Sequence, residues 1–153
     1  MDVIIRKANL NDPDRVVVMI KQFEKEILED YDVNLNTPNF KEEMLSYVDT
    51  SFVAEKDGEL IGLLAGRFIK FPFTTNKIYQ ESIWFMRREY RKSGLLLMNF
   101  LEKWCKEQKV KFIVTSRMAN YKSEKFDRVY KHLGFIPYEV NYIKNLEKEE
   151  SRE

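Results

Sequence analysis

The amino-acid sequence predicts an α/β protein with one domain, in which helices cover both faces of a mixed β-sheet. Two observations lead to this fold class. Segments rich in β-branched and aromatic residues alternate along the chain with segments whose apolar residues recur at helical spacing. Asp57-Gly58, between two of the strand-like segments, is a strong hairpin signal. The predicted order of elements is β-α-α-β-β-β-α-β-α-β, with no internal repeat and no linker.

Length and composition narrow the class of protein. The 153 residues fit one domain, which we place at residues 1–146, with a charged tail at 147–153. A net charge of +1 argues against a nucleic-acid-binding protein, which usually carries a clear basic excess. No apolar run approaches the roughly 20 residues of a membrane span, and the N-terminus lacks a signal-peptide pattern. With one cysteine, Cys105, we expect a cytoplasmic protein without disulfides or a metal site.

The first half of the chain is predicted to hold three strands and two helices. Asp12 is a candidate N-cap for the first helix, with Pro13 at the first helical position. The predicted elements are a strand at 3–6, helices at 13–27 and 40–48, and strands at 51–55 and 59–70.

The second half is predicted to alternate between strands and helices. Apolar residues such as Leu97, Leu101 and Cys105 fall on one face of a long helix, and Gly134 ends the next helix as its C′ residue. We expect the tail from residue 147 to fray. The predicted elements are a strand at 78–87, a helix at 95–108, a strand at 112–114, a helix at 126–133 and a last strand at 138–144.

The tetrapeptide Arg91-Lys92-Ser93-Gly94 stands between a strand and the most apolar helix. The first turn of a helix has unpaired N–H groups and a partial positive charge. Glycine lets the backbone approach a phosphate closely, and the three preceding side chains can add contacts. The segment therefore fits a pyrophosphate cradle; a tight strand-to-helix turn on a charged surface is the simpler alternative.

These residues resemble the acetyl-CoA-binding segment of the GNAT superfamily of N-acetyltransferases, written (Gln/Arg)-x-x-Gly-x-(Gly/Ala). Residues 91–95 fit that pattern, whereas Leu96 departs from it because Gly or Ala is expected there. The stretch FDRVYKHLGF, which contains Tyr130, is similar to the Tyr-x-x-x-Gly-Phe ending of the family's next helix, and PYEVNYIKNL resembles its closing strand. The resemblance covers residues 3–146 and agrees with the predicted order of elements.

The resemblance implies that acetyl-CoA binds between the fourth and fifth strands. The pyrophosphate would lie on the segment from Arg91 to Leu96, and the pantetheine arm would pair with the backbone of the fourth strand. Family members often place an asparagine after the fifth strand, which corresponds to Asn120. The residues implied in binding are Trp84, Phe85, Met86, Arg87, Arg91, Lys92, Ser93, Gly94, Leu95, Leu96 and Asn120.

Two residues are candidates for proton transfer. Glu81 lies within the fourth predicted strand, where apolar neighbours can raise its pKa and suit it to act as a general base. A solvent-facing Glu81, with a water as the base, is the alternative, and a bulge in this strand would decide which side it faces. Tyr130 matches the family tyrosine that protonates the departing CoA thiolate, although a core aromatic residue on an amphipathic helix has the same pattern.

The predicted function is transfer of the acetyl group of acetyl-CoA to a primary amine by direct attack. The alternative is a binding module with the same fold that acts through protein contacts, because a branched Leu96 replaces a small residue at the phosphate site. The sequence does not name the acceptor, and it leaves open a homodimer. Acidic residues around the end of the first helix fit a solvated helix end, and they also fit a site that attracts a cationic acceptor. These are Glu26, Glu29, Asp30 and Asp32.

Overall fold

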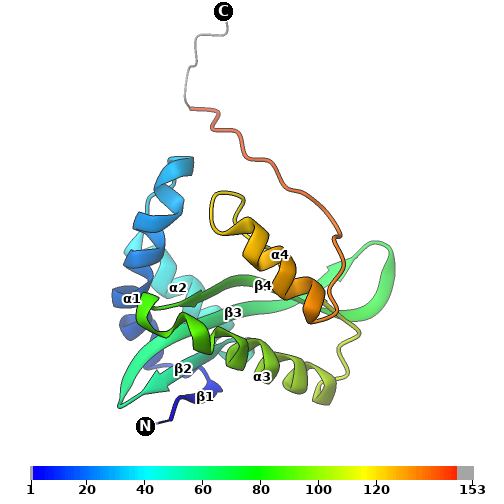
Figure 1. Cartoon of the computed structure of the whole chain (residues 1–153), viewed down its shortest axis with the longest axis horizontal. Helices are drawn as coiled ribbons and strands as arrows, with labels where there is room; N and C mark the ends of the chain where they lie inside the picture. The colour runs from blue at the N-terminus through cyan, green and yellow to red at the C-terminus, as the bar shows by residue number, and fades with distance from the viewer. Residues whose placement is uncertain (1, 148–153) are drawn as a thin grey trace, which may run out of the picture.

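A five-stranded sheet in the order β1-β2-β3-β4-β5 forms the centre of the protein (Figure 1). The computed structural model describes residues 2–147. Neighbouring strands are antiparallel except β4 and β5, which are parallel. The strands are β1 (Ile4–Lys7), β2 (Phe52–Lys56), β3 (Glu59–Phe71), β4 (Thr74–Met86) and β5 (Phe112–Val114).

Helices cover both faces of this sheet, as the sequence predicts. One hydrophobic cluster joins α1 and α2 to one face, and a second joins α3 and α4 to the other. Successive residues of β3 divide between them, since Leu63 lies in the first cluster and Leu64 in the second. The helices are α1 (Asp12–Glu26), α2 (Thr37–Tyr47), α3 (Gly94–Glu107) and α4 (Ser123–His132), with short 3-10 helices η1 (Leu28–Tyr31), η2 (Val48–Thr50) and η3 (Arg88–Ser93).

Two turn predictions are confirmed by the backbone. Asp57 and Gly58 join β2 and β3 with φ angles of 51° and 80°, the left-handed pair that a tight two-residue hairpin requires. Gly134 follows α4 with a φ of 90°, and its N–H donates to the carbonyl of Lys131. Both turns depend on residues that tolerate a positive φ, which is why sequence identifies them well.

A bulge interrupts the pairing of β3 and β4. Ala65 pairs with Ile83, but the next residue of β3, Gly66, pairs with Glu81, so Ser82 is the extra residue. A methyl group added to Gly66 would overlap the carbonyl oxygen of Gln80 and the hydroxyl of Tyr79. Glycine therefore allows β3 to lie close to β4 beside Glu81.

The start of α1 differs slightly from its predicted form. Asn11 is the N-cap, and Asp12 is the first helical residue. The Asp12 side chain is fully buried and accepts two hydrogen bonds from Arg6 (2.8 and 2.9 Å). Its role is therefore to join β1 to α1 through a bidentate ion pair.

The predicted last strand at 138–144 is wrong for this structure. The described residues after α4 form no strand and run away from the sheet toward the C-terminus (Figure 1). Their alternating apolar residues have no neighbouring strand, and alternation alone does not supply one. The predicted fraying of the tail concerns mainly residues 148–153, which lie outside the described residues. None of the helices in residues 2–147 is long and apolar enough to cross a membrane.

Candidate active site

The parallel strands β4 and β5 part at one point, and the candidate site lies there. Their paired residues end at Gln80 and Val114. Beyond this point β4 continues to Met86 and stays paired with β3, whereas the chain after β5 turns into a loop. The edge of β4 that faces away from β3 therefore has no strand partner from residue 81 onward within the described chain. The resemblance implies that acetyl-CoA binds at this point, between the fourth and fifth strands; we call it the opening.

Glu81 lies at the apex of this opening and is buried, with 4% of its surface exposed. The structure thus contradicts the alternative of a solvent-facing charge. Thr115, immediately after β5, donates a hydrogen bond of 2.8 Å to Glu81 Oε1. Burial raises the pKa of Glu81 to about 7, and the hydrogen bonds from Thr115 and the Ser116 backbone only partly oppose that rise. A carboxyl group with this pKa changes protonation state near neutral pH.

Tyr130 of α4 reaches the same point from the other side of the opening. Its hydroxyl donates to the carbonyl of Ser116 (2.9 Å) and lies 3.0 Å from Thr115 Oγ1. Burial raises its pKa well above the usual value, so the phenol is protonated and able to donate. The ring packs against Trp84 and Phe135. Tyr130 is therefore a core aromatic residue whose hydroxyl also reaches the point where β4 and β5 part.

Thr115 connects the two predicted proton-transfer groups, and sequence analysis did not single it out. A threonine hydroxyl has one proton and two lone pairs. In this structure the Thr115 proton is given to Glu81 and the single Tyr130 proton to the Ser116 carbonyl, so the two hydroxyl oxygens are 3.0 Å apart and form a hydrogen bond only when one of these protons turns. Thr115 therefore lies within hydrogen-bond distance of both Glu81 and Tyr130. No local pattern marks this threonine, because its role depends on where β5 leaves the sheet.

The predicted cradle has a different internal geometry from the one expected. Gly94 is buried and has an ordinary helical φ of −59°. Its N–H donates to the carbonyl of Arg91, and an added methyl would face Met86 and Trp84 at 3.4 and 3.8 Å. The glycine therefore serves close packing of α3 on β4, rather than leaving its own N–H open to a phosphate. Leu95 and Leu96, beside it, are both exposed.

Arg91 is held in an ion-pair cluster. Its guanidinium donates to Glu26 of α1 (2.7 Å), and Arg88 donates to the other oxygen of the same carboxylate (2.9 Å). Burial alone would raise the pKa of Glu26, but hydrogen bonds from Arg91 and Arg88 outweigh it and lower the pKa. The Arg91 guanidinium also lies 5.2 Å from the centre of the Tyr121 ring. The cluster holds η3, α1 and the loop before α4 together, while Lys92 is exposed.

Of the four residues predicted to lie along the pantetheine arm, three are the last of β4 and the fourth, Arg87, follows it. Phe85 and Met86 are buried on opposite faces of the sheet. Trp84 donates from its indole nitrogen to the carbonyl of Gly94 (3.2 Å). The N–H of Arg87 donates to Ile61 of β3 (2.7 Å), so it points away from the opening.

Asn120 lies in the loop between β5 and α4, as predicted, but its amide is already engaged. It donates to the carbonyl of Ile27 (3.1 Å) and to Asp30 (2.7 Å). These contacts connect the loop to the end of α1. The adjacent Tyr121 hydroxyl is buried and has no hydrogen-bond partner among the described residues.

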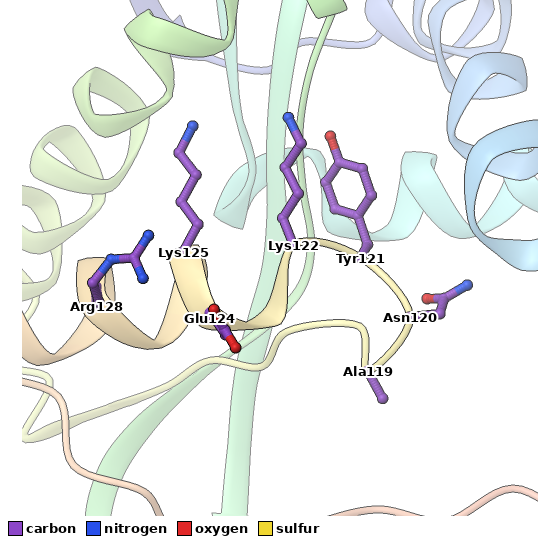
Figure 2. Close-up of a pocket in the computed structure, with 7 residues that line it drawn as sticks. All are labelled: Ala119, Asn120, Tyr121, Lys122, Glu124, Lys125 and Arg128. Carbon is purple, nitrogen blue, oxygen red and sulfur yellow. The ribbon is translucent and has the colours of Figure 1, made fainter.

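A pocket of about 490 Å³ lies over the start of α4 (Figure 2). Figure 2 shows the side chains of Lys122 and Lys125 extending to the same side as the Tyr121 hydroxyl, whereas Glu124 and Ala119 point elsewhere. Because the Tyr121 ring lies against Arg91, this side faces η3 and the start of α3. Basic residues therefore lie on both α4 and η3. The pocket is lined by Ala119, Asn120, Tyr121, Lys122, Glu124, Lys125 and Arg128.

These features fit acetyl-CoA. The unpaired edge of β4 can bond an amide-containing arm, and the basic groups on η3 and α4 suit its phosphates. The buried Tyr121 hydroxyl, which has no partner, offers a further polar contact beside Arg91. Within residues 2–147, no group of three or more His, Cys, Asp or Glu side chains is placed to hold a metal ion.

Comparison with known proteins agrees with this geometry. A model of the acetyltransferase (GNAT) family matches residues 19–135 of the chain. No curated protein sequence matches the chain.

Several solved structures share the fold. One is a ribosomal-protein-alanine N-acetyltransferase from Brucella melitensis biovar Abortus 2308, with a TM-score of 0.72 and 17% identity over 95% of this chain and 99% of that one. A predicted acetyltransferase with acetyl-CoA, from Clostridium acetobutylicum, has a TM-score of 0.71 and 20% identity over 95% and 97%. AAC(6')-Iy, in complex with the bisubstrate analogue CoA-S-monomethyl-acetylneamine, has a TM-score of 0.70 and 18% identity over 95% and 99%. At these identities the structures show a common fold.

Proposed function

Because the chain belongs to the GNAT family of acetyltransferases, which use acetyl-CoA, we propose that it transfers the acetyl group to a primary amine by direct attack. One observation carries the proposal. The buried Glu81 carboxyl and the Tyr130 hydroxyl meet through Thr115 at the point where β4 and β5 part. A base and an acid thus lie at one end of the opening that receives the donor.

The reaction needs two proton transfers at this point. Acetyl-CoA supplies an activated thioester carbonyl, and the amine nitrogen forms a bond to its carbon while the carbon–sulfur bond breaks. Glu81 in its ionised form takes a proton from the amine. Tyr130 gives its proton to the sulfur that leaves, which is the role its protonated phenol suits. After the reaction, Glu81 is protonated and Tyr130 is a phenolate.

Thr115 can restore both groups. It accepts the proton of Glu81 on its hydroxyl oxygen and passes its own proton to Tyr130, across oxygen–oxygen distances of 2.8 and 3.0 Å. No proton has to leave the site in this exchange. Thr115 is thus a positioning and relay residue between the base and the acid.

The basic groups on both sides of the opening would hold the phosphates of the donor. Lys122 and Lys125 extend from the start of α4, and Lys92 is exposed on η3. Arg91 has its charge balanced by Glu26, so we assign it mainly to holding Tyr121 and α1 in place.

The acceptor is proposed to be cationic. Glu26 no longer supports this, because it is paired with two arginines. Glu29, Asp30 and Asp32 remain exposed around η1, which lies against the loop of Asn120. Negative potential there would concentrate amines that carry additional positive charge.

Thiol release from acetyl-CoA in the presence of different amines tests this function. We expect release with polycationic amines, together with the acetylated amine by mass spectrometry, and a weaker response to neutral amines. The preference should shrink in 1 M salt, where the screening length is only about 3 Å. If calorimetry detected no binding of acetyl-CoA at millimolar concentration, the non-catalytic binding module would be the better description.

A further inference from the structure

The two groups proposed to move protons are enclosed in this structure. Glu81 is 4% exposed and Tyr130 is 9% exposed, although both have to reach the reacting thioester and amine. A donor as large as acetyl-CoA cannot approach side chains this deeply buried unless an element beside the opening moves. Movement of a loop is a common solution at enclosed sites, because it admits the substrate and then excludes water.

The loop between β5 and α4 is the element placed to move. Residues 115–122 form turns and bends but no helix or strand, and Figure 1 shows the loop, in yellow, beside the end of α1. The first two residues of the loop are hydrogen-bonded to Glu81 and Tyr130, so they belong to the site itself. We call the rest of the loop, residues 117–122, the gate.

Three contacts fasten the gate to elements that adjoin the opening. Asn120 donates to the carbonyl of Ile27 (3.1 Å), after α1, and to the Asp30 carboxylate of η1 (2.7 Å). The Tyr121 ring centre lies 5.2 Å from the guanidinium of Arg91 in η3. Because η3 follows the end of β4, these contacts place the gate across the end of the opening farthest from the proton-transfer groups. Each contact is individually weak, so the gate can release them without unfolding its neighbours.

One polar atom of the gate indicates what the gate closes over. The Tyr121 hydroxyl is buried and has no hydrogen-bond partner within residues 2–147, which is costly for a polar group. Its ring lies against Arg91, and the side chains of Lys122 and Lys125 extend to the same side (Figure 2). Phosphate oxygens placed there would accept the hydroxyl proton and balance the positive charges.

We propose that the gate releases α1, η1 and η3 to admit acetyl-CoA and then closes over the phosphates of the bound donor. This inference rests on the proposed function for the identity of the donor. Asp30 is the anchor of the gate, a positioning residue that acts through its contact with Asn120. Because the gate is closed both before and after binding, it slows the entry and the exit of the donor alike, in proportion to the small fraction of molecules in which it is open.

Stopped-flow binding of acetyl-CoA without an amine tests the gate, with the fluorescence of Trp84, which packs against Tyr130, as the signal. Asp30→Ala removes the carboxylate that holds Asn120. We expect kon and koff each to rise about 3- to 10-fold, the factor that one ordinary hydrogen bond represents. Glu29→Ala is the matched control, because it removes the same charge from the preceding residue of η1. Its koff should equal that of the wild type, and its Kd should lie within about twofold of the Kd of Asp30→Ala.

Tyr121→Phe removes only the hydroxyl without a partner. Its kon should stay near that of the wild type, and its koff should rise about 3- to 10-fold, because the hydroxyl acts only on the bound donor. An unchanged koff would overturn closure over the phosphates. Thermal unfolding shows that each variant is folded.

Two further results separate the gate from the proposed function. If acetyl-CoA binds and the rates of Asp30→Ala equal those of Glu29→Ala, the gate is overturned and the acetyltransferase function stands. If acetyl-CoA at millimolar concentration binds to none of these proteins, both are overturned.

Discussion

The Thr115 hydroxyl donates a hydrogen bond of 2.8 Å to Glu81, which joins the loop after β5 to the apex of the opening. The same oxygen lies 3.0 Å from the hydroxyl of Tyr130. One small side chain therefore contacts both groups proposed to move protons. The position of Thr115 follows from the parting of β4 and β5, which sends the chain after Val114 across the end of the opening.

Thr115→Val should keep the shape of the side chain and remove the hydroxyl. Loss of a hydrogen bond to a charged acceptor costs about 1.5–3 kcal/mol, so the pKa of Glu81 should rise by roughly one unit or more. Less of the base is then ionised at pH 7, and kcat should fall about tenfold and recover partly as the pH rises. The pH dependence of kcat measures both effects.

Thr115→Ser retains the hydroxyl and is the matched control. It should keep a pH profile close to that of the wild type, with a smaller loss of rate from looser packing. If the valine and serine variants had the same profile, the hydroxyl would have no part in proton transfer.

Tyr130→Phe removes only the phenolic hydroxyl and keeps the ring that packs against Trp84. We expect kcat to fall by roughly 10- to 1000-fold, because the leaving sulfur loses its proton donor. Affinity for acetyl-CoA, measured by calorimetry, should barely change. If the Tyr130→Phe variant had the kcat of the wild type under conditions where chemistry limits the rate, Tyr130 would serve packing alone.

Gly66→Ala should destabilise the protein, because the added methyl would overlap backbone of β4 next to Glu81. Overpacking of this kind costs about 1–3 kcal/mol, and the melting temperature should fall by several degrees. Gly94→Ala is the control, since its added methyl would be no closer than 3.4 Å to its neighbours. Equal melting temperatures for the two variants would contradict the close approach of β3 and β4 at the bulge.

Lys125→Glu reverses one of the charges that extend toward η3 (Figure 2). The KM for acetyl-CoA should rise about 3- to 10-fold at low salt, and the effect should weaken in 1 M salt because the interaction is screened. Lys131→Glu makes the same change at the other end of α4 and should have little effect. An equal rise in KM for both variants would show only a general effect of net charge.

Local chemistry explains which parts of the fold were predictable. Asp57-Gly58 and Gly134 were identified because their turns require a positive φ. Glycine and aspartate at these positions indicate that requirement, since few other residues tolerate it. The strand expected at 138–144 was wrong because alternation shows that a segment can pair, but not whether a partner strand is present in the same chain. Pairing is a long-range property, which a local pattern does not contain.

The site was predicted only in part for the same reason. Glu81 was recognisable as the acidic residue within its strand, and Tyr130 from the resemblance to the family's Tyr-x-x-x-Gly-Phe motif; the structure places both beside Thr115. Thr115 was missed because its importance comes from a contact across 34 positions of the chain. Likewise, Glu26 appeared to be a free negative charge until the structure placed Arg88 and Arg91, more than 60 positions away, against it.

The central claim is that Glu81 is the base, and the pH dependence of kcat/KM with and without its carboxyl group tests it most directly. Because the pKa of Glu81 is raised to about 7, the ionised form increases as the pH rises through neutrality, and the wild-type value should rise with an inflection near pH 7. The Glu81→Gln profile should lack that inflection, and its kcat/KM at pH 7 should be at least tenfold lower. The value should recover partly at high pH, where the free amine is abundant. A Glu81→Gln profile with the same height and inflection as the wild type would contradict the account.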